Sequence, residues 1–159
     1  ASKQGAGTTF RLFFPRLQGC EAADTEKESV REVSCGTENV LIVEDDDEIR
    51  DLMERTLLRK GYKVEACAHP GQAILVAEKK GYSLDVIIAD IGLPFMNGVE
   101  LVERLRNELP GIKALFVSGY PDRAPEMANS LFLRKPFSED ALADAVRRLL
   151  DGKVETRRK

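Results

Sequence analysis

Short apolar runs alternate along most of this chain with segments of helical period, and no other feature of the sequence constrains the fold as strongly. Within residues 39–152 the runs are NVLIV, YKVEAC, LDVIIA, KALFVS and LFLRK. Strands that alternate with helices form βα units, and the strands of such units pair in parallel. The pattern therefore predicts an α/β fold in which about five helices flank a doubly wound, five-stranded parallel sheet.

Two of the helical segments have recognisable ends. DEIRDLMERTLLRKG keeps its apolar residues on one face and stops at Gly61. SEDALADAVRRLLDG has Ser138 as its predicted N-cap, acids in the first turn, and Gly152 at its end. The third apolar run is apolar almost throughout, which is typical of a strand covered by helices on both faces. We therefore expect the sheet to lie between two layers of helices.

Composition divides the chain into four parts. Residues 1–17 contain GTTFRLFFPRL, whose alternation predicts a strand, although one strand cannot fold alone. Residues 18–37 are rich in acids and small residues, which is linker composition. Residues 38–152 hold the alternating pattern, and residues 153–159 form a short basic tail. We therefore expect one domain at residues 38–152 and a piece of another upstream.

Charge and composition argue against several classes of protein. The formal net charge of −3 gives no reason to expect a nucleic-acid partner. No run approaches the roughly 18 apolar residues that span a bilayer, so we expect no membrane contact by this chain. The cysteines Cys20, Cys35 and Cys67 form no CxxC pair, so neither a disulfide framework nor a zinc site is indicated. Free thiols favour a cytoplasmic protein.

Charged and polar residues follow the apolar runs. The first run leads into Glu44 and Asp45, the third ends at Asp90, the fourth at Ser118 and the fifth at Lys135. In doubly wound sheets ligands bind beyond the carboxyl ends of the strands, so these side chains are expected to meet at one edge. Alone, Asp90 fits a helix N-cap and Lys135 a surface lysine. Their convergence indicates a functional site.

The chemistry of such a site follows from its charges. Crowded carboxylates repel one another unless protons or a cation offset the charge. With oxygen ligands and neither histidine nor cysteine nearby, Mg²⁺ fits best. A carboxylate can attack phosphorus to give an aspartyl phosphate, while a metal, a lysine and a hydroxyl stabilise the phosphoryl oxygens. The residues therefore predict phosphoryl transfer to an aspartate.

In combination these motifs resemble a known family, the receiver domains of two-component signalling. The resemblance covers residues 37–152 and rests on LIVEDDDEIR, VIIADIGLPFMNGVEL, LFVSGY and FLRKPFSEDAL. It implies a flavodoxin-like receiver fold with strand order 2-1-3-4-5. It also implies phosphorylation by a histidine kinase or a histidine phosphotransfer domain with Mg²⁺ as cofactor.

The resemblance also implies roles for individual acids. Asp90 matches the phosphoacceptor, and Glu44 with Asp45 matches the acidic pair. Asp45 is expected to bind Mg²⁺ directly and Glu44 mainly through water, with the backbone carbonyl of Gly92 as a further ligand. Sliding the run EDDDE by one residue would nominate Asp45 and Asp46 instead.

The remaining roles concern the fourth and fifth runs. Ser118 matches the switch hydroxyl, Lys135 the phosphate-contacting lysine and Phe132 the aromatic switch position, while the bond before Pro136 is expected to be cis. Residues 118–135 are some five residues shorter than is usual in the family, and they include two prolines in PDRAPEMANS. We therefore expect the fourth helix to be short, irregular or absent.

The segment KQGAGTTFRLFFPRL resembles the closing strand of a histidine kinase ATP-binding domain. A kinase strand, a linker and a receiver in this order are typical of a hybrid sensor histidine kinase, so we expect the chain to derive from one without being a kinase itself. His69 fits a loop residue better than a ligand or phosphodonor. Phe95 and Met96 fit either packing within a loop or contact with a partner.

Two other functions stay open from the sequence. One is a receiver-like interaction module that is never phosphorylated, which the short fourth-helix region favours. The other is a phosphatase with an aspartyl nucleophile, which expects a second acid where Gly92 stands. The sequence does not specify the oligomeric state, the signal sensed or the lifetime of a phosphorylated state.

Overall fold

The computed structural model of the chain describes residue 13 and residues 36–80, 83–120, 125 and 127–152. The chain divides into two units, Ala1–Arg31 and Glu32–Lys159. In the first unit only Phe13 is described, and its side chain is exposed. The predicted kinase strand, nearly all of the predicted linker and the basic tail therefore lie outside the described residues.

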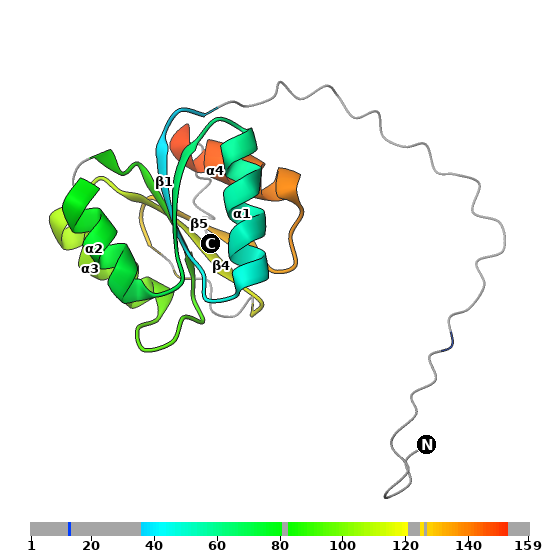
Figure 1. Cartoon of the computed structure of the whole chain (residues 1–159), viewed down its shortest axis with the longest axis horizontal. Coiled ribbons are helices and arrows are strands. Elements are labelled where there is room, and N and C mark those ends of the chain that lie inside the picture. The colour runs from blue at the N-terminus through cyan, green and yellow to red at the C-terminus, as the bar shows by residue number, and fades with distance from the viewer. Residues whose placement is uncertain (1–12, 14–35, 81–82, 121–124, 126, 153–159) are drawn as a thin grey trace, which may run out of the picture. The chain divides into compact units, whose positions relative to one another are not determined.

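The second unit contains a sheet of five parallel strands in the order β2-β1-β3-β4-β5, which confirms the predicted fold. Its elements follow one another along the chain as alternating strands and helices until β4, after which β5 comes next (Figure 1). The strands are β1 (Asn39–Val43), β2 (Lys63–Cys67), β3 (Val86–Asp90), β4 (Lys113–Ser118) and β5 (Ser130–Arg134). The helices are α1 (Asp47–Arg59), α2 (Pro70–Lys80), α3 (Gly98–Glu108) and α4 (Glu139–Leu150).

Two layers of helices cover the sheet, with α1 and α4 on one face and α2 and α3 on the other (Figure 1). Side chains alternate between the faces along each strand, so β1 contributes Val40 and Ile42 to one apolar cluster and Leu41 and Val43 to the other. All four of these side chains are fully buried. The three-layer arrangement expected from the apolar runs is therefore present.

Side chains cap the helices that position the site. Asp46 caps α1 by accepting hydrogen bonds from the backbone N–H groups of Glu48 and Ile49. Asn97 and Glu100 form a capping box at the start of α3. Ser138 caps α4, as predicted from the sequence. These caps fix where the chain turns from each strand into the following helix.

No helix separates β4 from β5 among the described residues of that connection, which are 119, 120, 125 and 127–129. The described chain thus has four helices where the sequence pattern suggested about five. Arg106 of α3 links the residues just before β4 and β5, because its guanidinium donates hydrogen bonds to the carbonyls of Ile112 (3.3 Å) and Asn129 (3.1 Å). Met127 packs against the apolar cluster beneath α2 and α3.

The segment before β1 is held at the amino edge of the sheet. The Gly36 N–H donates to the carbonyl of Lys60 at 2.8 Å. Glu38 pairs with Arg147 of α4 at 2.9 Å. The ammonium of Lys113 donates to the carbonyl of Leu150, at the end of α4. Both chain connections of the domain are therefore fixed at this edge.

Among the described residues, none of the helices combines the length with the apolar character that a bilayer crossing requires.

We predict that Gly98→Ala destabilises the domain, because a Cβ at this position would lie 2.3 Å from the carbonyl oxygen of Asp90. Overpacking of this kind costs about 2 kcal/mol of unfolding free energy. Urea denaturation followed by circular dichroism measures the change. Gly111→Ala is the matched control, since nothing lies within 4 Å of a Cβ there, and equal midpoints for the two variants would contradict the prediction.

Candidate functional site

The predicted site residues come together at the carboxyl edge of the sheet. Glu44 and Asp45 directly follow β1, Asp90 ends β3, Ser118 ends β4, and Lys135 directly follows β5. The parallel register places these strand ends side by side, with Ala89 opposite Val43 and Asp90 opposite Val117. Positions far apart in the sequence thus become neighbours.

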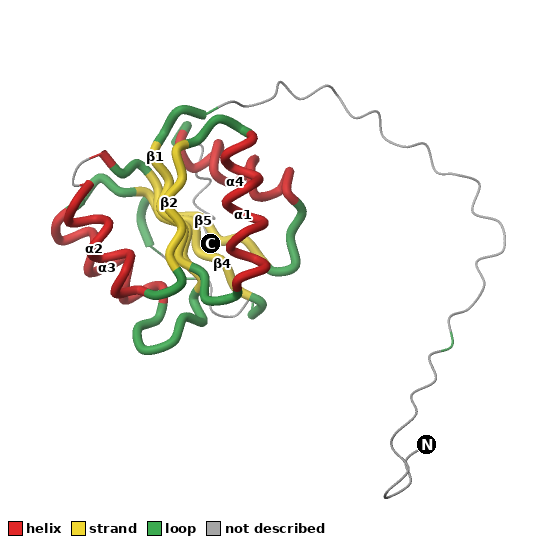
Figure 2. The backbone as a smooth tube through the Cα atoms, viewed as in Figure 1, coloured by secondary structure: helices red, strands yellow, loops and turns green. Residues whose placement is uncertain are grey.

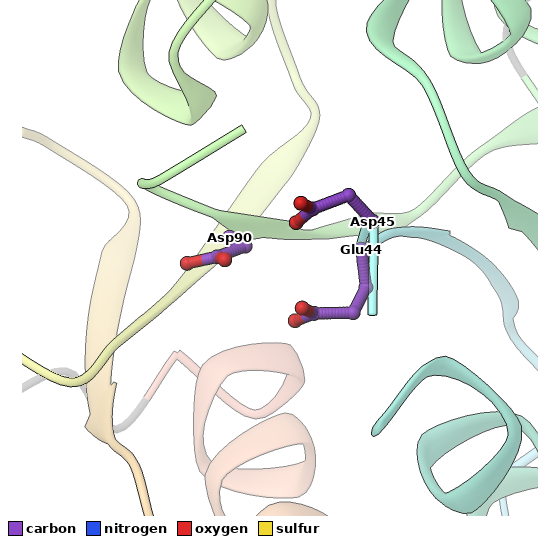
Figure 3. Close-up of side chains that lie close together, drawn as sticks. All are labelled: Glu44, Asp45 and Asp90. Atoms are coloured by element: carbon purple, nitrogen blue, oxygen red, sulfur yellow. The ribbon is translucent and has the colours of Figure 1, made fainter. Parts of the chain in front are cut away.

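Three carboxylates form a cluster there. One oxygen from each of Glu44, Asp45 and Asp90 lies within 4.8 Å of the others. Figure 3 shows the side chains of Glu44 and Asp45 extending toward Asp90. Glu44 is buried, Asp90 is 14% exposed and Asp45 is exposed, so the cluster opens to solvent on one side. Three oxygen ligands at this spacing suit a hard divalent cation such as Mg²⁺.

Asp46 lies outside this cluster of three. Its carboxylate accepts the Glu48 N–H at 2.9 Å and the Ile49 N–H at 3.1 Å, and so caps α1. Of the two alignments of the acidic run, the structure therefore brings Glu44 and Asp45, rather than Asp45 and Asp46, together with Asp90.

The ammonium of Lys135 offsets part of this negative charge. Its Nζ lies 2.9 Å and 2.7 Å from the two oxygens of Glu44 and 3.2 Å from Oδ2 of Asp90. Burial raises the pKa of the Glu44 carboxyl, and the nearby Lys135 opposes that rise. The bond between Lys135 and Pro136 is cis, as expected from the resemblance.

Gly92 contributes a donor to the phosphoacceptor candidate. Its backbone N–H donates to Oδ1 of Asp90 at 3.1 Å, so the two oxygens of Asp90 have different partners. One faces the Gly92 N–H and the other faces the Lys135 ammonium. The metal-binding role expected for the carbonyl of Gly92 stays a prediction.

The two switch candidates lie in different surroundings. Ser118 is 4% exposed, and its Oγ accepts the backbone N–H of Tyr120 at 3.1 Å. Its carbonyl accepts the backbone N–H of Lys135, which ties the end of β4 to the lysine. Phe132 is opposite Phe116 in the sheet and packs against the apolar cluster beneath α2 and α3.

Sequence reasoning missed the contribution of Arg50. Its guanidinium donates to the backbone carbonyl of Glu44 at 2.9 Å and pairs with Asp47. Arg50 therefore holds the turn from β1 into α1, on which the acidic pair depends. The spacing of three residues between Asp47 and Arg50 signals their ion pair, but no local pattern signals the bond to Glu44. His69, by contrast, is exposed just before α2.

Comparison with known proteins identifies the family. Residues 40–147 match the family described as response regulator receiver domain. The chain belongs to this family. The match starts at the second residue of β1, ends within α4 and includes all the site residues predicted from the sequence.

Relatives and solved structures agree with this assignment. Sensor kinase CckA of Brucella abortus is 36% identical over 94% of this chain, which corresponds to 17% of the relative's length. The receiver domain of the hybrid histidine kinase CckA superposes with a TM-score of 0.64 at 31% identity, covering 70% of this chain and 98% of that one. The chemotaxis response regulator CheY4 of Vibrio cholerae gives a TM-score of 0.64 at 30% identity, covering 72% and 100%.

We predict that Lys135→Met makes the stability of the metal-free domain more dependent on pH. Glu44 already has a raised pKa, so its contribution to stability is complete below the ordinary value of 4.5 and is lost as the pH rises through the folded pKa. Without Lys135 the pKa of Glu44 rises further, so the stability lost between pH 4 and pH 7 is larger than in the wild-type domain. Urea titrations between pH 4 and pH 7 in EDTA measure this difference.

Lys79→Met, an exposed position on α2, is the control for this pH series. A loss in Lys135→Met of the same size at pH 4 and pH 7 would show that charge pairing with Glu44 is not its cause.

Proposed function

We propose that this receiver domain accepts a phosphoryl group from a phosphohistidine onto Asp90. The observation that carries the proposal is the position of the Asp90 carboxylate, with the Lys135 ammonium 3.2 Å from one oxygen and the acidic pair within 4.8 Å. A nucleophilic carboxylate, a fixed cation and a cluster suited to a divalent metal are the parts that phosphoryl transfer needs.

In the proposed reaction an oxygen of Asp90 attacks the phosphorus. The bond between phosphorus and the imidazole nitrogen breaks, and its electron pair stays on that nitrogen. Lys135 then offsets negative charge on the phosphoryl oxygens, for which its contact with Oδ2 of Asp90 places it well. The Gly92 N–H holds the other oxygen of Asp90 and so orients the nucleophile.

Asp45, Asp90 and the carbonyl of Gly92 are the proposed direct ligands of Mg²⁺, with Glu44 acting through water. The double contact of Glu44 with Lys135 supports this indirect role, because both oxygens of Glu44 already face an ammonium. When bound, Mg²⁺ neutralises charge on the transferring phosphoryl group.

Ser118 and Phe132 are the proposed switch residues. The Oγ of Ser118 has a backbone partner in Tyr120 and would turn toward a phosphoryl oxygen. Phe132 carries no hydroxyl, so any movement of its ring would change packing against the cluster beneath α2 and α3 rather than a hydrogen bond.

We further infer that the chain derives from a hybrid sensor histidine kinase. The similarity to a sensor kinase covers 94% of the chain, far more than the receiver match at residues 40–147. This extent supports residues 1–17 as part of a kinase ATP-binding domain, 18–37 as linker and 153–159 as tail. The partners proposed are a histidine kinase or a histidine phosphotransfer domain, and the proposed location is the cytoplasm.

A receiver that is never phosphorylated is the second candidate. The described part of the β4–β5 connection contains no helix, and this favours the second candidate because in the family that face commonly changes on phosphorylation. The two candidates differ in whether Asp90 reacts.

Intact mass after incubation with acetyl phosphate distinguishes them. We expect one added phosphoryl group with Mg²⁺ and none in EDTA or in Asp90→Asn. A folded wild-type domain that gains no mass would instead support the unphosphorylated interaction module.

Metal affinity provides a separate test of the ligand assignment. We expect Asp45→Asn to weaken Mg²⁺ binding roughly tenfold or more in isothermal titration calorimetry, because a direct ligand loses its charge. Asp46→Asn is the matched control, since asparagine still caps a helix and Asp46 lies outside the cluster. The opposite ranking of the two variants would favour the alternative alignment of the acidic run.

A further inference from the structure

Phe95 is fully exposed in the loop that follows the phosphoacceptor strand. Its relative exposure is 102%, the highest among the described large apolar residues. The loop occupies residues 91–97, starts directly after Asp90 and extends past the ends of the strands (Figure 2). Of the two roles that the sequence left open for Phe95, packing within the loop is therefore wrong.

The backbone of Phe95 is strained. Its φ is +70°, in the left-handed region that bulky side chains rarely adopt. The Met96 N–H donates to the carbonyl of Pro94 at 2.9 Å, which closes a γ-turn around Phe95 in its less favourable form. Asparagine or glycine would suit this position better. The backbone conformation of Phe95 therefore destabilises the folded state, and no burial of its side chain offsets this.

The base of this loop is firmly held. Ile91 and Leu93 are buried, Met96 packs against the cluster beneath α2 and α3, and the side chain of Asn97 caps α3. The exposed ring of Phe95 therefore projects from an anchored turn. An anchored aromatic residue loses little conformational freedom when a partner covers it.

We propose that Phe95 is an anchor for the protein that carries the phosphohistidine, an inference that rests on the proposed function. A donor must bring its phosphorus into contact with Asp90, so its surface covers the loop that begins there. Buried aromatic side chains contribute strongly to such interfaces. Glu48, an exposed acid in the first turn of α1, lies at the same edge. The fitting partner offers an apolar pocket to Phe95 and a basic residue to this acid.

Phe95→Asn tests the proposal by separating stability, chemistry and partner binding. We expect its Tm to rise by roughly 2–5 °C, because asparagine tolerates the left-handed backbone. Phosphorylation by acetyl phosphate is expected to be unchanged, since Phe95 contacts none of the reacting groups described above. Transfer from a protein donor is expected to fall roughly tenfold or more in kcat/KM. The donor used is the autophosphorylated sensor kinase of Brucella abortus.

Leu75→Ala is the control, because Leu75 is also an exposed apolar residue but lies on α2, and its transfer rate is expected to stay within about twofold of wild type. Equal transfer to wild type and Phe95→Asn overturns the proposal, as does an equal loss with acetyl phosphate. If acetyl phosphate phosphorylates the wild-type domain but the kinase does not, a protein with a phosphohistidine is not the partner, and the proposal is overturned. Failure of both acetyl phosphate and the kinase to modify the folded wild-type domain refutes the proposed function, and with it the inference that rests on it, whereas equal transfer to the two proteins refutes the role of Phe95 alone.

Discussion

The site depends on the balance between three crowded carboxylates and one ammonium. Parallel pairing places the carboxyl ends of β1 and β3 side by side. One oxygen from each of Glu44, Asp45 and Asp90 therefore lies within 4.8 Å of the others. Lys135 lies between Glu44 and Asp90 and forms an ion pair with each of them. Because Glu44 is buried, the lysine compensates a charge that solvent cannot reach. The cluster is open to solvent on the side of Asp45.

The sequence predicted the parts of this arrangement that follow from strand and helix patterns. An apolar run ending at Asp90 predicted a buried strand with a charge at its carboxyl end, and the sheet rule predicted which other residues would join it. Ser138 was recognisable as a cap because its side chain acts on backbone groups only three residues away. Such local or periodic signals are readable without knowledge of the tertiary structure.

The remaining features depend on contacts that no local pattern encodes. The run EDDDE permits two alignments with the family. Only the folded structure shows that the carboxylate of Asp46 caps the N-terminus of α1. The bond from Arg50 to the carbonyl of Glu44 depends on how α1 leaves β1. The positive φ of Phe95 could not be predicted from the sequence either, because phenylalanine is unfavourable in a γ-turn and does not indicate a turn.

The anchoring of both chain connections at the amino edge has a consequence for larger proteins. Gly36 and Glu38 are held there, and α4 returns there at Leu150, so the attachments lie opposite the carboxylates. The five residues of a central strand separate the two edges by about 17 Å. Neighbouring domains can therefore be joined to this domain at its amino edge without altering the opposite edge, which carries the carboxylates.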